Sequence, residues 1–292
     1  MNVELVDFEA ADGVLLNGFM KRNHSHKMII STHGMGSDCF KIRDRVICEE
    51  ASKVGIDYFC YNNRGSYQVR TVKKNSDGKS EKMFAGTSLE DVEEGYFDIK
   101  GAIQKAIDLG YTEIYLQGHS LGATKTLYTY TKLKEENDSV LKYIKGVILL
   151  SLVDIPRTLQ IYSGEKYETF KNYAESKEKE NKLFDFMPLE SFIQPISVKT
   201  YLKYVKYYQN IDFARYNDNN YNFKELNSID VPLFMRFGNV GEMIEQDAKE
   251  LTEMLNKKVN IKDKNIGYID GATHSYDEKE KVLAEQIVAF LA

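Results

Sequence analysis

The stretch that decides the fold is Glu113-Ile-Tyr-Leu-Gln-Gly-His-Ser-Leu-Gly122, followed by the run from Ala123 to Glu136. Residues 113–117 are mostly apolar and predict a short strand, and the run after Gly122 has the composition of a helix. Between them lies a G-x-S-x-G pentapeptide, which indicates a nucleophilic serine when a strand precedes it and a helix follows. The sequence therefore predicts a tight turn that presents the Ser120 hydroxyl at a helix N-terminus.

The two glycines of this motif have a steric role. Side chains at positions 118 and 122 would collide with the neighbouring strand or helix, and the serine between them is expected to have strained backbone angles. The amide of Leu121 would then point toward an oxyanion formed beside Ser120. A bare pentapeptide of this kind arises by chance in roughly one chain in ten of this length. The alternative is a glycine-rich turn that only packs.

Alternating strand and helix patterns surround the motif. Further strands are predicted over residues 3–8, 14–20, 27–32, 56–61, 143–152, 231–237 and 266–269. Further helices are predicted over residues 40–54, 89–109, 242–256 and 277–291. This order favours an α/β fold, a mostly parallel twisted sheet covered by helices on both faces. The first two strands would form an antiparallel hairpin at its edge.

Two expectations concern the connections between these elements. Ser37 and Asp38 offer a cap for the helix predicted from Phe40. Residues 66–87 are polar around Lys73–Ser80, and we expect them to form a surface loop.

Residues 153–228 differ in character from the rest of the chain. They are rich in tyrosine, have helical periodicity and contain prolines at 156, 188 and 195. The segment is too long for a loop and too helical for another unit of the sheet. We therefore expect a helical, tyrosine-rich lid inserted after the sixth strand of an α/β core formed by residues 1–152 and 229–292. Active sites in such sheets lie beyond the carboxyl ends of the strands, where a lid would cover Ser120.

Composition narrows the classes of partner. The 292 residues have a net charge of −5 with acidic and basic residues mixed, which does not favour a nucleic-acid partner. Cys39, Cys48 and Cys60 match no familiar zinc or disulfide spacing. No apolar run approaches membrane-spanning length. We expect a cytoplasmic protein without a nucleic-acid or membrane partner, and we leave its oligomeric state open, a homodimer included.

Four motifs in order resemble the α/β-hydrolase superfamily, and the resemblance covers almost the whole chain. They are the loop His33–Gly36, the turn Asn62–Gly65, the pentapeptide Gly118–Gly122, and His274 before the last helix. The loop resembles the family's oxyanion loop, and the turn resembles its D-x-R-G turn. The resemblance implies the fold of that superfamily and a serine hydrolase. A looser likeness to feruloyl-esterase-like and acyl-esterase members lies in the pentapeptide, the histidine after the last strand and the insertion before the acid-bearing strand.

The resemblance also implies roles for individual residues. A serine hydroxyl is a poor nucleophile near neutral pH, so Ser120 needs a base, and His274 stands where the family carries it. The other four histidines are expected in a turn, in the oxyanion loop or in the packing around the pentapeptide. The backbone amides of Leu121 and Met35 would stabilise the oxyanion.

The acid departs from the family's pattern. Members usually show Gly-x-x-Asp after the corresponding strand, but here Gly238–Gly241 is followed by Glu242, so glycine occupies the aspartate position. Glu242 is the preferred acid, because its extra methylene can offset a displacement of one residue. Glu245 and Asp154 are alternatives, the latter at the end of the preceding strand. A further alternative is that no acid orients the base and that activity is low.

These inferences predict a carboxylesterase that cleaves small to medium esters through an acyl-enzyme. Tyrosine-rich walls suit an aromatic or medium-chain acyl group, and the reaction requires no metal or organic cofactor. A thioesterase or a peptidase using the same residues is an alternative. Another is a catalytically silent protein that binds a small ligand in the same fold.

Overall fold

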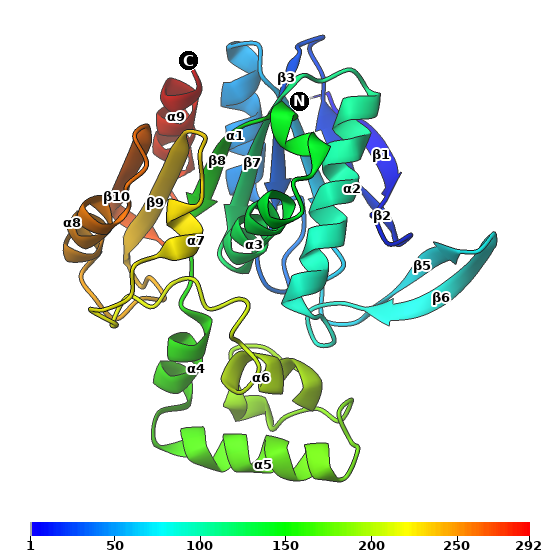
Figure 1. Ribbon diagram of the computed structural model, residues 1–292, viewed down its shortest axis with the longest axis vertical. Helices are drawn as coiled ribbons and strands as arrows, with labels where there is room; N and C mark the ends of the chain where they lie inside the picture. The colour runs from blue at the N-terminus through cyan, green and yellow to red at the C-terminus, as the bar shows by residue number, and fades with distance from the viewer. Residues whose placement is uncertain (1) are drawn as a thin grey trace.

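An eight-stranded sheet forms the centre of the computed structural model, which describes residues 2–292 (Figure 1). The order of the strands is β1-β2-β4-β3-β7-β8-β9-β10. Their bounds are β1 Glu4–Glu9, β2 Leu15–Lys21, β3 Lys27–Thr32, β4 Asp57–Asn62, β7 Glu113–His119, β8 Ile144–Leu150, β9 Leu233–Val240 and β10 Lys264–Thr273. From β4 to β10 all neighbours are parallel, whereas β2 pairs antiparallel with both β1 and β4. The prediction of a mostly parallel sheet with an antiparallel edge is confirmed.

The burial of the strands explains why this sequence forms a covered sheet. Every residue of β4 is buried, and only one residue of β8 is exposed. Such nearly continuous burial is typical of parallel strands that have helices on both faces. At the outer edge, the chain between β1 and β2 turns through Gly13, whose φ of +92° is open to glycine without steric cost.

Helices cover both faces of the sheet. α2 (Gly95–Asp108), α3 (Leu121–Glu135) and α8 (Ala248–Lys258) contribute to the larger apolar cluster on one face. α1 (Ile42–Lys53) and α9 (Glu280–Leu291) pack against each other and contribute to the cluster on the other face. Among residues 2–292, none of the helices combines the length and the apolar character needed to cross a bilayer.

Two helix starts differ from the sequence prediction. The N-cap position of α1 is held by Lys41, and no side chain caps the helix, because the Asp38 carboxylate accepts from the amide of Phe40 (2.7 Å) before the helix begins. The predicted cap at Ser37 and Asp38 is therefore wrong. α8 begins at Ala248 behind an Asp247 cap, so Glu242 lies in the loop after β9 and not on the helix predicted from residue 242.

Residues 66–87 also differ from the prediction of a surface loop. They contain a two-stranded hairpin of β5 (Arg70–Ser76) and β6 (Lys79–Ala85), which projects from the sheet in Figure 1. Asp77 and Gly78 form its turn with φ of +51° and +75°. Asp-Gly is a strong signal for such a two-residue turn. The polarity of the segment masked that signal, because most side chains of the two strands are exposed or half-buried.

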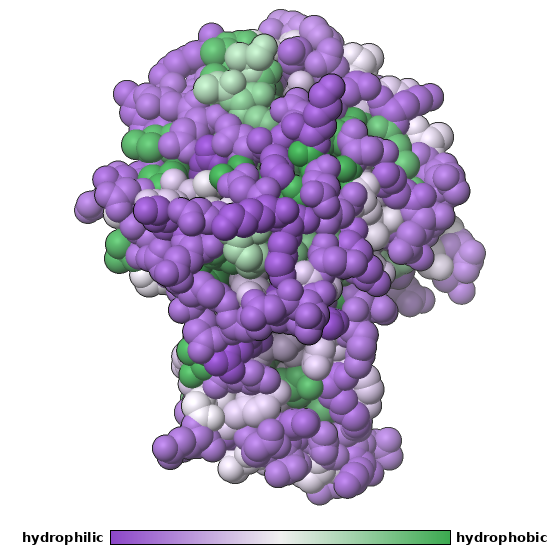
Figure 2. Space-filling model, turned by 60° about the vertical axis from the view of Figure 1, so that its left-hand side comes forward, coloured by the Kyte–Doolittle hydropathy of each residue, from purple (hydrophilic) through white to green (hydrophobic). Residues whose placement is uncertain are grey.

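The segment between β8 and β9 is helical. It contains α4 (Ile155–Ser163), α5 (Tyr167–Lys179), α6 (Val198–Val205) and the short α7 (Lys224–Asn227). β8 is the sixth strand of the large sheet in chain order. Figure 1 shows α4, α5 and α6 below the sheet, and Figure 2 shows them as a narrower body with a largely hydrophilic surface.

This helical insertion has an apolar cluster of its own. Leu159, Phe170 and Tyr201 belong to it, and Leu121 of α3 joins it from the core. The later part of the segment, including Tyr216, packs into the larger cluster of the sheet instead. The insertion is therefore anchored to the core at both of its ends.

Candidate active site

The turn at Ser120 has the strained geometry that the pentapeptide predicts. Ser120 lies between the end of β7 and the start of α3, with φ of +56° and ψ of −126°. A Cβ on Gly118 would overlap the carbonyl of Gly122, and a Cβ on Gly122 would overlap the carbonyl of Thr32 on β3. Glycine at both positions therefore lets β3, β7 and α3 approach closely enough to hold the serine in place.

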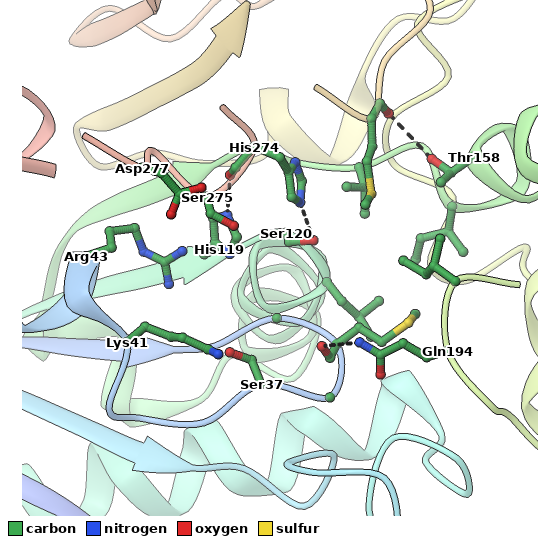
Figure 3. A pocket seen from close by; sticks show the side chains of 18 of the residues that line it. Ser37, Lys41, Arg43, His119, Ser120, Thr158, Gln194, His274, Ser275 and Asp277 are labelled. Atoms are coloured by element: carbon green, nitrogen blue, oxygen red, sulfur yellow. Dashed lines mark hydrogen bonds between the residues drawn. The ribbon is translucent and has the colours of Figure 1, made fainter. Parts of the chain in front are cut away.

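The structure brings Ser120, His274 and Glu242 together in one chain of hydrogen bonds. Nε2 of His274 lies 2.9 Å from Oγ of Ser120 (Figure 3), and Nδ1 of the same ring contacts Oε1 of Glu242. The three residues follow β7, β10 and β9, so they share one edge of the sheet. A hydroxyl, an imidazole and a carboxylate in this order are the arrangement that activates a serine.

Glu242 is held by one donor from the segment after β8 and one from the end of β9. Its Oε2 accepts from the hydroxyl of Ser151 (2.9 Å) and from the amide of Gly238 (2.8 Å), and its side chain is 4% exposed. Burial pushes the pKa of Glu242 upward, but the hydrogen bond and charge of His274, with these two donors, outweigh burial and lower the pKa below its ordinary value. The carboxylate is therefore stabilised in its charged form.

Ser151 is a residue that the sequence analysis did not identify. It follows β8 with φ of +48°, and its hydroxyl lies between Glu242 and the hydroxyl of Tyr276 (3.0 Å). Tyr276 donates to the carbonyl of Arg236 (2.7 Å), which leaves the Ser151 proton for Glu242. No motif marks Ser151, because its role depends on a contact between the ends of β8 and β9.

The other two candidate acids are engaged elsewhere. Asp154 caps α4 by accepting from the amide of Arg157 (3.1 Å), and burial raises the pKa of this carboxyl to about 6. Glu245 is exposed and pairs with the guanidinium of Arg157 (2.7 Å). Among residues 2–292, Glu242 is the carboxylate that contacts the ring of His274.

Met35 and Leu121 both line the cavity in front of Ser120. The Leu121 amide belongs to the first turn of α3, where N–H groups have no acceptor within the helix. The amide of Met35 donates no hydrogen bond to any of residues 2–292. A Cβ on Gly34 would lie 3.0 Å from Cβ of Ser120, so the loop passes close to the serine. Both amides are therefore available beside the hydroxyl.

The ring of His33 fixes this loop. Nδ1 lies 2.8 Å from the carbonyl of Gly34, and Nε2 accepts from the amide of Asn63 (3.2 Å). Burial lowers the pKa of His33 to about 3, so the ring is neutral, with the proton assigned to Nδ1 by these partners. The ring thus connects the loop of residues 33–36 to the turn of residues 62–65.

His119 supports the loop that carries His274. Its Nε2 lies 2.8 Å from the backbone carbonyl of His274, and the centroids of the two rings are 5.0 Å apart. Burial lowers the pKa of His119 well below its ordinary value, which leaves a neutral ring that donates to this carbonyl. His119 therefore positions the backbone next to the candidate base.

Ser120 opens into a cavity of about 410 Å³ whose two sides differ in chemistry (Figure 3). On the side of the insertion and the β9 loop, the wall is mostly apolar: Val153, Ile155, Phe192, Ile193 and Met243. On the side of the core, Ile42 is apolar but most of the wall is polar or charged: Ser37, Lys41, Arg43, Ser275, Asp277 and Glu280. Residues 2–292 contain no group of three or more His, Cys, Asp or Glu side chains arranged to hold a metal ion.

The insertion also contacts the loop beside the serine directly. Nε2 of Gln194 donates to the carbonyl of Met35 (3.3 Å), as Figure 3 shows, and Oε1 of Gln194 accepts from Gln68 (2.9 Å). The insertion therefore reaches over the cavity to the opposite wall.

Comparisons with solved structures find hydrolases of similar architecture. Est1E from Butyrivibrio proteoclasticus with bound ferulic acid is 18% identical over 97% of both chains, with a TM-score of 0.64. The esterase Pf2001 of Pyrococcus furiosus is 18% identical over 99% of this chain and 91% of its own, with a TM-score of 0.61. The hydrolase GrgF from Penicillium sp. sh18 is 16% identical over 100% and 98%, with a TM-score of 0.66. At these identities the likeness establishes a shared fold and leaves the substrate undefined.

Sequence comparisons add no relative. No protein-family model matches the chain, and no curated protein matches it.

Proposed function

From the α/β-hydrolase fold and the contacts of Ser120 with His274 and of His274 with Glu242, we propose that the protein is a serine hydrolase that cleaves carboxylic esters. The observation that carries the proposal is the 2.9 Å contact between Oγ of Ser120 and Nε2 of His274, with a buried carboxylate on the far side of the ring. A base within hydrogen-bond reach of the hydroxyl is what a serine nucleophile requires.

In the proposed mechanism, Oγ of Ser120 attacks the ester carbonyl while Nε2 of His274 takes its proton. Glu242 holds the ring with its proton on Nδ1 and stabilises the imidazolium that forms. The oxyanion is bound by the amides of Leu121 and Met35, and loss of one such donor typically costs about 2.7 to 4 kcal/mol of transition-state stabilisation. His274 then gives the proton to the leaving alcohol.

Water completes the reaction by the same route. It attacks the acyl group on Ser120 while His274 accepts its proton, and the carboxylic acid and the free serine result. No step calls for a metal or an organic cofactor.

We propose that the helical insertion of residues 153–228 acts as a lid that selects the apolar part of the ester. Its residues Phe192 and Ile193, with Met243 from the β9 loop, provide an apolar wall next to Ser120. Such a wall removes apolar surface from water when an aliphatic or aromatic group binds. A cavity of about 410 Å³ suits small to medium groups better than long lipid chains.

A fluorophosphonate probe tests the nucleophile. We expect the wild-type protein to be labelled and Ser120→Ala to remain unlabelled. A wild-type protein that is not labelled, and that binds a nitrophenyl ester without turning it over, would be a ligand-binding protein of this fold. That result would refute the proposal.

Turnover of matched substrates tests the bond that is cleaved. We expect nitrophenyl esters to be hydrolysed faster than acyl thioesters and peptide anilides with the same acyl group. The reverse ranking would assign a thioesterase or a peptidase to the same residues. The cytoplasmic location and the absence of nucleic-acid and membrane partners stay predictions from composition.

A further inference from the structure

The polar side of the active-site cavity is built at the N-terminus of helix α1. Lys41 at the N-cap position, and Ile42 and Arg43, the first two residues of this 12-residue helix, all line the cavity. No side chain among residues 2–292 caps its first amides. The start of an uncapped helix carries unsatisfied N–H groups and a partial positive charge, so it favours an anion.

The side chain of Arg43 is a second and independent feature of the same place. It is 5% exposed, and Nη2 donates to Oδ2 of Asp44 (2.7 Å). Nε is buried without a partner, and Nη1 makes no hydrogen bond with any of residues 2–292. In Figure 3 the guanidinium extends into the cavity region toward His119 and Ser275. A buried guanidinium with unused donors is costly unless an acceptor meets it.

The Asp44 carboxylate holds Nη2 of the Arg43 guanidinium and leaves the edge with Nη1 unused. The Asp44 carboxylate also accepts from the hydroxyls of Ser31 on β3 (2.7 Å) and Tyr58 on β4 (2.9 Å), which fix it between α1 and the sheet. One nitrogen of the guanidinium is thereby held in place, and the edge with Nη1 remains for a ligand. A planar guanidinium fixed in this way is well suited to bind a carboxylate.

Two carboxylates limit where an anion can lie. Asp277 and Glu280 line the cavity at the start of α9, and Asp277 accepts from the hydroxyl of Thr273 (2.8 Å). They lie on the same polar wall as Lys41 and Arg43 and weaken the attraction of that wall for an anion. An anion in the cavity is therefore favoured only where it meets Lys41 and the unused donors of Arg43 at the start of α1.

We propose that the ester substrate carries a carboxylate, which Arg43 binds at the start of α1 while the apolar part of the ester lies against the insertion. This inference rests on the proposed ester hydrolysis at Ser120 and adds the class of substrate. The carboxylate belongs either to the acyl part, as in a half-ester of a dicarboxylic acid, or to the alcohol part, as in an ester of a hydroxybenzoic acid.

Two pairs of esters test the inference and distinguish these sources. The first compares mono-4-nitrophenyl glutarate with 4-nitrophenyl valerate, which differ by a carboxylate in the acyl chain. The second compares 4-carboxyphenyl acetate with 4-carbamoylphenyl acetate, which differ in the alcohol part. We expect kcat/KM of the wild-type protein to favour the anionic member of one pair by about tenfold or more, as a charge-assisted hydrogen bond allows.

Variants assign the preference to Arg43. Arg43→Gln is expected to lower the anionic-to-neutral ratio of kcat/KM by about tenfold. Arg43→Lys, which keeps a cation beside Asp44, is expected to retain part of the preference. The control is Arg45→Gln, which removes the same charge from an exposed residue two positions along α1 and should leave the ratio unchanged. Glu280→Gln is expected to raise the ratio, because it removes a repelling carboxylate.

The readout is the ratio because a general disturbance of the site lowers both members of a pair alike. A wild-type ratio near one in both pairs, with the neutral esters turned over, overturns the inference and leaves ester hydrolysis intact. A preference for the anion that survives in both Arg43 variants also overturns it. Absence of turnover for all four esters, with no fluorophosphonate labelling of Ser120, overturns the proposed function and the inference together.

Discussion

Replacing Glu242 by glutamine tests its role as the acid that orients His274, because the change only exchanges one carboxylate oxygen for an NH2 group. Two of the three hydrogen-bond donors outside the ring, the hydroxyl of Ser151 (2.9 Å) and the amide of Gly238 (2.8 Å), point at Oε2, and the amide of Met243 reaches Oε1 at a longer 3.3 Å. The two shorter bonds select the carbonyl oxygen of a glutamine for the Oε2 position, which turns the NH2 group toward Nδ1 of His274. An NH2 group can only donate, so Nδ1 must accept, and the ring proton moves to Nε2. The base then presents a proton to Ser120 where it needs a lone pair.

The expected loss follows from that reversal of the tautomer. Exchange of a triad aspartate for asparagine, which leaves the geometry intact but produces the wrong tautomer, lowers kcat by about 10⁴. At about 1.36 kcal/mol per tenfold, this corresponds to roughly 5 kcal/mol of transition-state stabilisation. We expect Glu242→Gln to lower kcat by 10³ to 10⁴, as order-of-magnitude values, with a much smaller change in KM.

The assay is hydrolysis of a nitrophenyl ester, with kcat and KM determined separately. Asp154→Asn is the matched control, because asparagine keeps the cap of α4 and the change also removes one carboxylate near the cavity. Glu245→Gln is a second control at an exposed position. Retention of more than a tenth of wild-type kcat in Glu242→Gln, or a larger loss in Asp154→Asn, would refute the assignment of Glu242.

Three further predictions follow from the same contacts. Ser151→Ala removes a donor to Glu242 but leaves the Gly238 amide, so kcat should fall by about tenfold, and an unchanged kcat would remove Ser151 from the site. Gly122→Ala should prevent close approach of α3 to β3 and lower the midpoint of urea unfolding, and an unchanged midpoint would contradict this packing of α3 on β3. His33 has a pKa of about 3 in the folded chain and about 6.5 when unfolded, so its stabilising contribution is complete above pH 6.5 and is lost as the pH falls toward 3. At pH 5.5 the loss that is due to His33 is about 1.4 kcal/mol. Between pH 7.5 and pH 5.5, the free energy of unfolding measured with urea should therefore fall by about 1.4 kcal/mol more in the wild type than in His33→Gln.

Local sequence predicted those parts of the site that depend on neighbours along the chain. The turn at Ser120 needs a strand, two glycines and a helix, all within residues 113–136, and each is present. The hairpin of β5 and β6 lay outside the prediction although Asp77-Gly78 signals its turn, because the polarity of residues 66–87 is typical of a loop. Ser151 and Arg43 lay outside the prediction for a different reason. Their surroundings come from elements far apart in the sequence.

The displaced acid shows how a local constraint and a distant contact combine. Gly241 occupies the position where the superfamily's pattern places aspartate, and its φ of +59° is one that glycine adopts without steric cost. Glu242 comes one residue later, and its longer side chain reaches back so that Oε2 meets the amide of Gly238 at the end of β9. A Cβ on Gly238 would overlap the carbonyls at the end of β10, so the two strands approach closely just before His274. The loop thus favours glycine at 241, and the approach of β9 to β10 brings the glutamate within reach of the ring.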